Sequence, residues 1–146
     1  MAVNSINNMR VHEVFDKVAE AKTKKEKIDI LRRYDNQAIR DVLKGAFDDG
    51  IQFNLPEGDP PYEEGSETKP ASSLLKLSKK FPQYVAAQGN EQATPKAELQ
   101  FIKLLESLHP EEAKITLWMK NKDLEGKYKG ITKKLAEEAF PGLISQ

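Results

Sequence analysis

Apolar residues recur at intervals of three and four along most of the chain, which is the spacing of amphipathic helices. Thr23 and Glu26 fit a capping box, in which the threonine hydroxyl accepts a hydrogen bond from the backbone of the third helical residue. Asp35 or Asn36 is suited to cap the next helix. The buried positions expected in the first three helices are Val11, Val14, Phe15 and Val18; Ile28, Leu31 and Tyr34; and Ile39, Val42, Leu43 and Phe47. Three short helices with short joints predict a helical bundle.

The helical pattern resumes in the second half of the chain. Ser72 or Ser73 is expected to cap a helix that ends at Phe81, because the residue before a proline avoids the helical conformation. Thr94 with Pro95 predicts another start, and a further helix follows His109. The apolar positions of these helices are Leu74, Leu75 and Leu77; Leu99, Ile102, Leu105 and Leu108, which form an apolar face; Ala113, Leu117 and Trp118, which we expect to face inward; and Ile131, Leu135 and Ala139 of a final short helix. Residues 88–93 and 121–130 are polar links.

A different pattern separates the two halves. Residues 51–55 alternate between apolar and polar side chains, which predicts one short strand or an extended tether. Residues 56–70 hold four prolines, two glycines and several acids, and this composition is typical of a loop. We therefore predict a single all-α domain: a compact bundle of six or seven short helices in two halves, about 9–55 and 72–144, joined by an acidic, proline-rich loop (56–71), with at most one short strand.

Composition narrows the chemistry available to this fold. The 146 residues include no cysteine, which excludes disulfides, thiolate metal sites and cysteine nucleophiles. Two histidines give almost no material for a histidine-rich metal site or a catalytic triad. No apolar run reaches the length of a membrane span and no signal-peptide core is seen at the N-terminus, so we expect a cytoplasmic protein without membrane contact. We also expect no cofactor.

The formal net charge is zero, but acids and bases are unevenly distributed. Seven acids and no base lie between Gly45 and Thr68, whereas seven lysines and only two acids lie between Lys114 and Lys134. A smaller basic run surrounds the second predicted helix. Such runs are usually solvated faces. Lys133 and Lys134 nevertheless stand in the first turn of the last helix, where a cation opposes the helix dipole unless an anion such as phosphate is bound.

Two stretches resemble the N-terminal DNA-binding domain of ATP-dependent DNA ligases of the T-even phage type. The first comprises Thr23–Leu31, Asn36, Ile39–Phe47 and Ile51–Phe53, and the second comprises Trp118–Gly126, Ile131–Ala136 and Phe140–Ile144. The second resembles the family's Arg-Asp-Leu, Gly, short-helix, Pro-Gly-Leu signature, with Lys122 in place of the arginine. No Lys-x-Asp-Gly adenylation motif is present. The resemblance implies a freestanding phage protein with the ligase DNA-binding fold and without the catalytic domain.

The resemblance and the lysine clusters together predict non-catalytic binding of double-stranded or nicked DNA through backbone phosphates, which position a protein without reading sequence. This activity would be accessory to phage DNA replication, repair or recombination, with proteins of those processes as further partners, in the host-cell cytoplasm. The candidate contact residues are Lys24, Lys25, Lys120, Lys122, Lys127, Lys129, Thr132, Lys133 and Lys134.

Two other classes of function stay open. The neutral charge and the acidic loop also suit an adaptor that keeps the fold, has lost DNA binding and docks a protein partner. An enzyme is disfavoured, because no nucleophile, base and oxyanion-binding group can be assembled from this inventory. The paired acids Asp48 and Asp49, with Asp59 or Glu63 and Glu64, could in principle hold a divalent ion, but their spacing fits no calcium-loop pattern. We therefore expect no metal.

Overall fold

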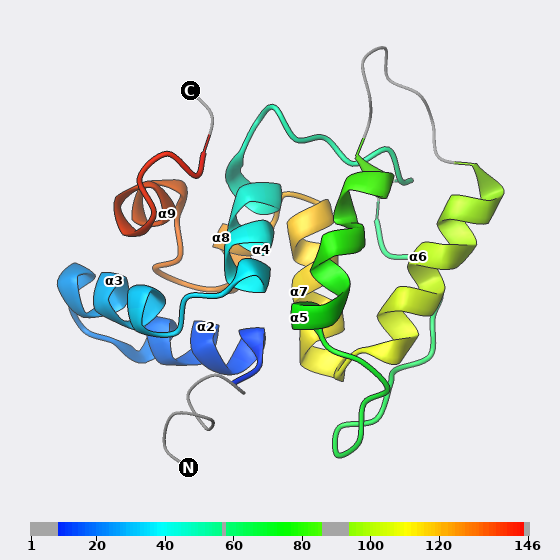
Figure 1. Cartoon of the computed structure of the whole chain (residues 1–146), viewed down its shortest axis with the longest axis horizontal. Coiled ribbons are helices and arrows are strands. Elements are labelled where there is room, and N and C mark those ends of the chain that lie inside the picture. Colours follow the sequence, from blue (N-terminus) through cyan, green and yellow to red (C-terminus); the bar gives the residue numbers. More distant parts are fainter. Residues whose placement is uncertain (1–8, 57, 86–93, 145–146) are drawn as a thin grey trace.

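The predicted all-α fold is confirmed by a computed structural model, which describes residues 9–56, 58–85 and 94–144. Seven predicted helical segments are present, one of them divided into α5 and a 3-10 helix, η1, and a single-turn helix, α8, is added (Figure 1). The polar link at 88–93 and the acid Glu57 lie outside the described residues. The elements are α2 (Val11–Glu20), α3 (Lys24–Arg33), α4 (Gln37–Phe47), α5 (Leu74–Leu77), η1 (Ser78–Tyr84), α6 (Pro95–Ser107), α7 (Pro110–Lys120), α8 (Leu124–Lys127) and α9 (Lys133–Ala139).

Side-chain caps fix most helix starts where the sequence predicts them. Thr23, Asn36, Ser73, Thr94 and Thr132 each accept a hydrogen bond from the backbone N–H three residues later, at 2.9 to 3.3 Å. These bonds satisfy N–H groups that have no partner within the helix itself. The local sequence therefore determines where α3, α4, α5, α6 and α9 begin.

Helix α4 lies at the centre of the bundle and packs against α5, η1, α7 and α9 (Figure 1). Its buried face includes Ile39, Val42 and Leu43, all fully enclosed. Gly45 is on the face of α4 that packs against α7, and a Cβ atom added there would come within 2.7 Å of the Met119 sulfur. A side chain at this position would push the two helices apart. Glycine lowers the stability of an isolated helix, but here it permits the close packing of α4 against α7.

The apolar face of α6 differs from the prediction. Phe101, Leu104, Leu105 and Leu108 are buried, whereas Leu99 is 54% exposed and Ile102 is only partly buried. The prediction was wrong at Leu99 because α6 has apolar residues on more than one side, and tertiary packing chooses among them. Phe101 packs edge-on against Tyr84 of η1, with ring centroids 5.3 Å apart. This contact selects the face that turns inward.

The segment at 51–55 is extended, and it forms an isolated antiparallel bridge between Phe53 and Val85 rather than a strand of a sheet. The acidic loop then follows the flank of α6 and α7. Its path is fixed by a hydrogen bond from the Glu63 backbone N–H to the Glu106 carboxylate and by one from Asn121 to Asp59. The loop is therefore attached to the second half of the chain.

A buried carboxylate joins three remote segments. Glu112 of α7 is 1% exposed and accepts hydrogen bonds from Arg10 Nη1 at 3.0 Å, from the Val11 backbone N–H at 3.3 Å and from the Leu74 backbone N–H at 3.4 Å. Arg10 also donates to the Ser72 carbonyl at 3.5 Å. The negative charge thus lies at the positive ends of α2 and α5, where the helix dipole favours it.

The substitution Glu112→Gln is expected to lower the free energy of unfolding by about 3 kcal/mol, because it leaves Arg10 without its buried counter-charge. Chemical denaturation followed by circular dichroism measures this loss. Glu111→Gln is the matched control on the same helix, because Glu111 forms only an exposed pair with Lys114, and a change of less than about 0.5 kcal/mol is expected there. Equal effects of the two substitutions would contradict this role for Glu112.

The two histidines stack on one another across α2 and the start of α7. Their ring centroids are 4.4 Å apart, and His109 Nδ1 accepts a hydrogen bond from the Glu111 backbone N–H. Burial and then the neighbouring His109 lower the pKa of His12 below its ordinary 6.5, against the opposing effect of Glu112, Glu13 and Asp16. The folded protein therefore prefers neutral His12.

We expect the imidazole protons of His12 to titrate below pH 6.5 in an NMR titration. The substitution His109→Asn removes the neighbouring ring and its charge. It should raise the titration midpoint of His12, which burial still holds below 6.5. As the pH falls, the unfolded state takes up this proton first. The contribution of neutral His12 to the free energy of unfolding is therefore complete above the pKa of His12 in the unfolded state, and it is lost as the pH falls through its pKa in the folded state. A His12 midpoint at or above 6.5 would contradict the stacked, half-buried arrangement.

Candidate lysine surface

Two of the predicted contact lysines hold the fold together through their ammonium groups. Lys120 is 7% exposed and donates to the Pro56 carbonyl at 2.8 Å and to the Asn121 side chain at 2.6 Å. Lys122 has a left-handed backbone, with φ of 59°, and its ammonium donates to three backbone carbonyls. These belong to Gly45, Asp48 and Ile51, at 2.6, 3.1 and 2.6 Å.

These bonds give Lys122 a structural role at the end of α4. The carbonyls near a helix C-terminus have no partners within the helix, and the helix dipole makes that end attractive to a cation. Burial lowers the pKa of Lys122, although Asp49 and Asp48 oppose the shift. A phosphate would have to compete with three carbonyls for the Lys122 ammonium, and with the Pro56 carbonyl and the Asn121 side chain for that of Lys120. Both lysines are therefore poor DNA contacts.

The remaining predicted residues lie on or beside α3, α8 and α9. The Thr132 hydroxyl caps α9 by accepting from the Leu135 backbone N–H, which leaves it committed to the helix. Lys24 pairs with Glu138, Lys127 with Asp123, and Lys133 with Asp49, and the last two pairs are separated by 3.7 Å. Exposed pairs of this kind contribute about 0–1 kcal/mol, so a phosphate can displace the acid.

Lys25, Lys129 and Lys134 are exposed, and within the described ranges they have no ion-pair or hydrogen-bond partner. Among the predicted contact residues, they are the ones most available to an external anion. We call the set Lys24, Lys25, Lys127, Lys129, Lys133 and Lys134 the α3–α9 lysine surface.

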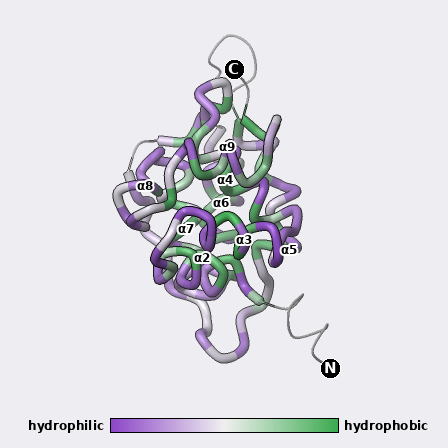
Figure 2. The backbone as a smooth tube through the Cα atoms, turned by 90° about the vertical axis from the view of Figure 1, so that its left-hand side faces the viewer, coloured by the Kyte–Doolittle hydropathy of each residue, from purple (hydrophilic) through white to green (hydrophobic). Residues whose placement is uncertain are grey.

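The structure brings together two lysine groups that the sequence predicts separately. α3 packs against α9, and both lie at the same end of the molecule (Figures 1 and 2). A Cβ atom on Gly130 would lie 3.0 Å from Lys27 Cε, so the segment before α9 passes close to α3. Arg32 then donates from α3 to the carbonyls of Ala139 and Glu138 at the end of α9, at 3.0 Å each. Helix α3, which carries Lys24 and Lys25, therefore packs beside the segment and helix that carry Lys129, Lys133 and Lys134.

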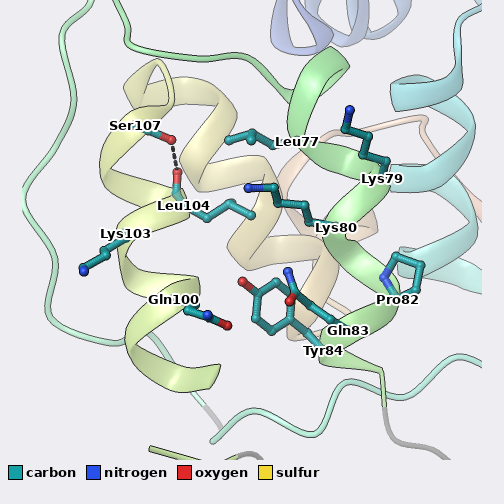
Figure 3. A pocket seen from close by; sticks show the side chains of 10 residues that line it. All are labelled: Leu77, Lys79, Lys80, Pro82, Gln83, Tyr84, Gln100, Lys103, Leu104 and Ser107. Carbon is teal, nitrogen blue, oxygen red and sulfur yellow. Dashed lines mark hydrogen bonds between the residues drawn. The ribbon is translucent and has the colours of Figure 1, made fainter. Parts of the chain in front are cut away.

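A second lysine group was missed by the sequence reasoning. Lys79 and Lys80 of η1 and Lys103 of α6 line a cleft of about 690 Å³ between these two elements (Figure 3). Their signal in the sequence is weak, because Lys103 is one exposed lysine in a mixed helix and lies more than twenty residues from the other two. The two elements come together in the fold, where Tyr84 packs on Phe101.

Among the residues that the structure describes, no cluster of three or more histidine or carboxylate side chains is arranged to hold a metal ion. Nor does any helix in those ranges have the length and hydrophobicity needed to cross a membrane. The lysine groups are therefore the main features of the described surface from which a function can be argued.

Lys122→Met is expected to lower the free energy of unfolding by about 2 kcal/mol, because it removes charge-assisted hydrogen bonds and leaves carbonyls of α4 unpaired. Lys129→Met, which removes an ammonium without a described partner, should change it by less than about 0.5 kcal/mol. Urea unfolding of both variants measures the difference. A Lys122 variant as stable as the wild type would return this lysine to the set of free surface cations.

Comparison with known proteins assigns the chain to a family but does not assign a function. A search of curated proteins finds no match for the chain. One family model matches residues 14–126, which extend from α2 to α8 and include both the η1–α6 cleft and the lysines of α3. Because this match covers most of the sequence, the chain belongs to the DUF6433 family, a family of unknown function.

Proposed function

We propose that the chain binds double-stranded DNA without catalysing a reaction on it, through contacts between backbone phosphates and the α3–α9 lysine surface. The observation that carries the proposal is the packing of α3 against α9 and its preceding segment, which joins two separate lysine groups at one end of the molecule. A duplex offers a continuous array of phosphates to such a surface, and lysine binds phosphate as a mobile point charge.

Further support comes from the condition of the individual side chains. Three lysines of the surface have no partner in the described part of the chain, and the other three form exposed ion pairs that cost little to exchange for phosphate. The resemblance of residues 23–53 and 118–144 to ligase DNA-binding domains supports the same function. It favours a role accessory to phage DNA replication, repair or recombination in the host-cell cytoplasm.

Zero net charge sets the expected strength of this binding. Acids lie beside the lysines, among them Asp123, Glu137 and Glu138, so the attraction is local rather than a property of the whole molecule. Binding through phosphates alone typically gives dissociation constants of about 10⁻⁴ to 10⁻⁶ M at physiological salt, with a steep salt dependence. We expect a dissociation constant in this range for the binding of this protein to intact duplex.

The triple substitution of Lys25, Lys129 and Lys134 by Gln should weaken duplex binding and flatten its salt dependence. Each lost phosphate contact reduces the slope of log K against log salt by about 0.9, so three contacts reduce it by about 2.7. Fluorescence anisotropy with intact and nicked duplexes at several salt concentrations measures both quantities.

The matched control is the triple substitution of Lys69, Lys76 and Lys96 by Gln, which removes the same charge from exposed positions on the loop, α5 and α6. It should leave the salt slope unchanged. If the wild type shows no binding even in dilute buffer, or if both triple variants behave alike, the proposal fails. An adaptor that docks a protein partner is then the better explanation of the fold.

A further inference from the structure

The cleft between η1 and α6 is built differently from the α3–α9 lysine surface. It is partly open to solvent and has a volume of about 690 Å³, which is within the range of small-ligand sites. Its walls combine apolar side chains with several polar groups, and none of the described residues that line it is a carboxylate. The lining residues are Leu77, Lys79, Lys80, Pro82, Gln83, Tyr84, Gln100, Lys103, Leu104 and Ser107.

Tyr84 supplies the most informative group in this cleft. Its side chain is 2% exposed and is held edge-on against Phe101, yet its hydroxyl points between the two elements (Figure 3). Within the described residues this hydroxyl has no hydrogen-bond partner. Burial raises the pKa of Tyr84, so the hydroxyl stays protonated and can donate. The hydroxyl is open to the solvent in the cleft, where water or an acceptor on a bound ligand can take its hydrogen bond.

Three more polar side chains converge on the same space. Gln100 directs its amide towards Tyr84 from α6, Gln83 lies beside the Tyr84 ring on η1, and Lys80 extends across the upper part of the cleft (Figure 3). None of the three has a hydrogen-bond or ion-pair partner among the described residues. Four donors from two elements thus face one volume, and together they suit an acceptor with several oxygens.

The charges around the cleft favour an anion. Lys79 and Lys103 stand at its two rims and point away from its centre, where they raise the positive potential without filling the space (Figure 3). Helix α6 separates this cleft from the acidic loop, because Gln100, Lys103 and Ser107 line the cleft, whereas Glu98 and Ile102 line a hollow shared with Pro60 and Asp59 of the loop. An anion is therefore attracted to one flank of α6 and repelled from the other.

We propose that the η1–α6 cleft binds a nucleoside phosphate. The phosphate oxygens accept hydrogen bonds from Tyr84, Gln83, Gln100 and Lys80, and the base lies against the apolar wall formed by Leu77 and Leu104. A free nucleotide and a nucleotide within a DNA strand share this chemistry. The site is distinct from the α3–α9 lysine surface and does not depend on duplex binding there.

Isothermal titration of the full chain with dATP, deoxyadenosine, inorganic phosphate and a short single-stranded oligonucleotide tests this assignment. Saturable binding of dATP or of the oligonucleotide is expected, with deoxyadenosine and phosphate at least tenfold weaker. Whichever of dATP and the oligonucleotide binds more tightly shows whether the cleft takes a free nucleotide or a nucleotide within a DNA strand. NMR provides a local readout, because the side-chain amide signals of Gln83 and Gln100 should shift on binding.

Tyr84→Phe is the sharpest variant, because it removes the hydroxyl and keeps the ring that packs on Phe101. It should weaken binding of the preferred ligand about tenfold, as should Lys80→Gln, whereas Lys96→Gln on α6 outside the cleft should leave it unchanged. An unaltered melting temperature of each variant shows that the fold is intact.

Several results would overturn the inference. The absence of saturable binding by both dATP and the oligonucleotide would do so, as would a Tyr84→Phe variant that binds as tightly as the wild type. Equal affinity for inorganic phosphate and dATP would exclude a nucleoside-specific site. Loss of dATP binding in the Lys25, Lys129 and Lys134 triple variant would place the ligand on the other surface.

Discussion

The buried carboxylate of Glu112 is the constraint on which the arrangement of the helices depends. It lies where α2 and α5 both begin, and it accepts hydrogen bonds from the backbone of each. Because a buried charge without partners is very costly, the starts of these two helices must meet at α7 whenever the protein is folded. The position of α5 in turn fixes η1, and with it one wall of the cleft against α6. An electrostatic requirement at one residue thus determines the geometry of a distant site.

Cations at helix C-termini provide the complementary constraint. Lys27 donates to the carbonyls of Val18 and Ala21 at the end of α2. Arg32 donates to carbonyls at the end of α9, and Lys122 donates to the Gly45 carbonyl at the end of α4. Each is directed towards the negative end of a helix dipole. A substantial part of the basic inventory is therefore used inside the fold. Counting lysines in the sequence consequently overstates the charge available to a phosphate.

The helices could be predicted because their signals are local. Thr23, Asn36 and Thr94 lie within three residues of the N–H groups they cap, so their role follows from spacing alone. The roles of the lysines could not be predicted in the same way. Lys122 finds its carbonyl partners more than seventy residues earlier in the chain, and the convergence of Lys80 with Gln100 depends on how η1 packs on α6. Sequence patterns locate the elements, whereas the state of each surface charge is decided by tertiary contacts.

The two lysine groups differ in a way that bears on what each can recognise. The α3–α9 lysine surface is open and carries ion pairs that exchange readily with phosphate, which suits an extended polyanion bound in many registers. The η1–α6 cleft instead presents the hydroxyl of Tyr84, whose nearly buried ring is fixed in position by its contact with Phe101. Fixed donors lose little conformational freedom on binding and impose a geometry on the ligand. Charge on the open surface therefore provides attraction, whereas the fixed hydroxyl of Tyr84 can provide selectivity in the cleft.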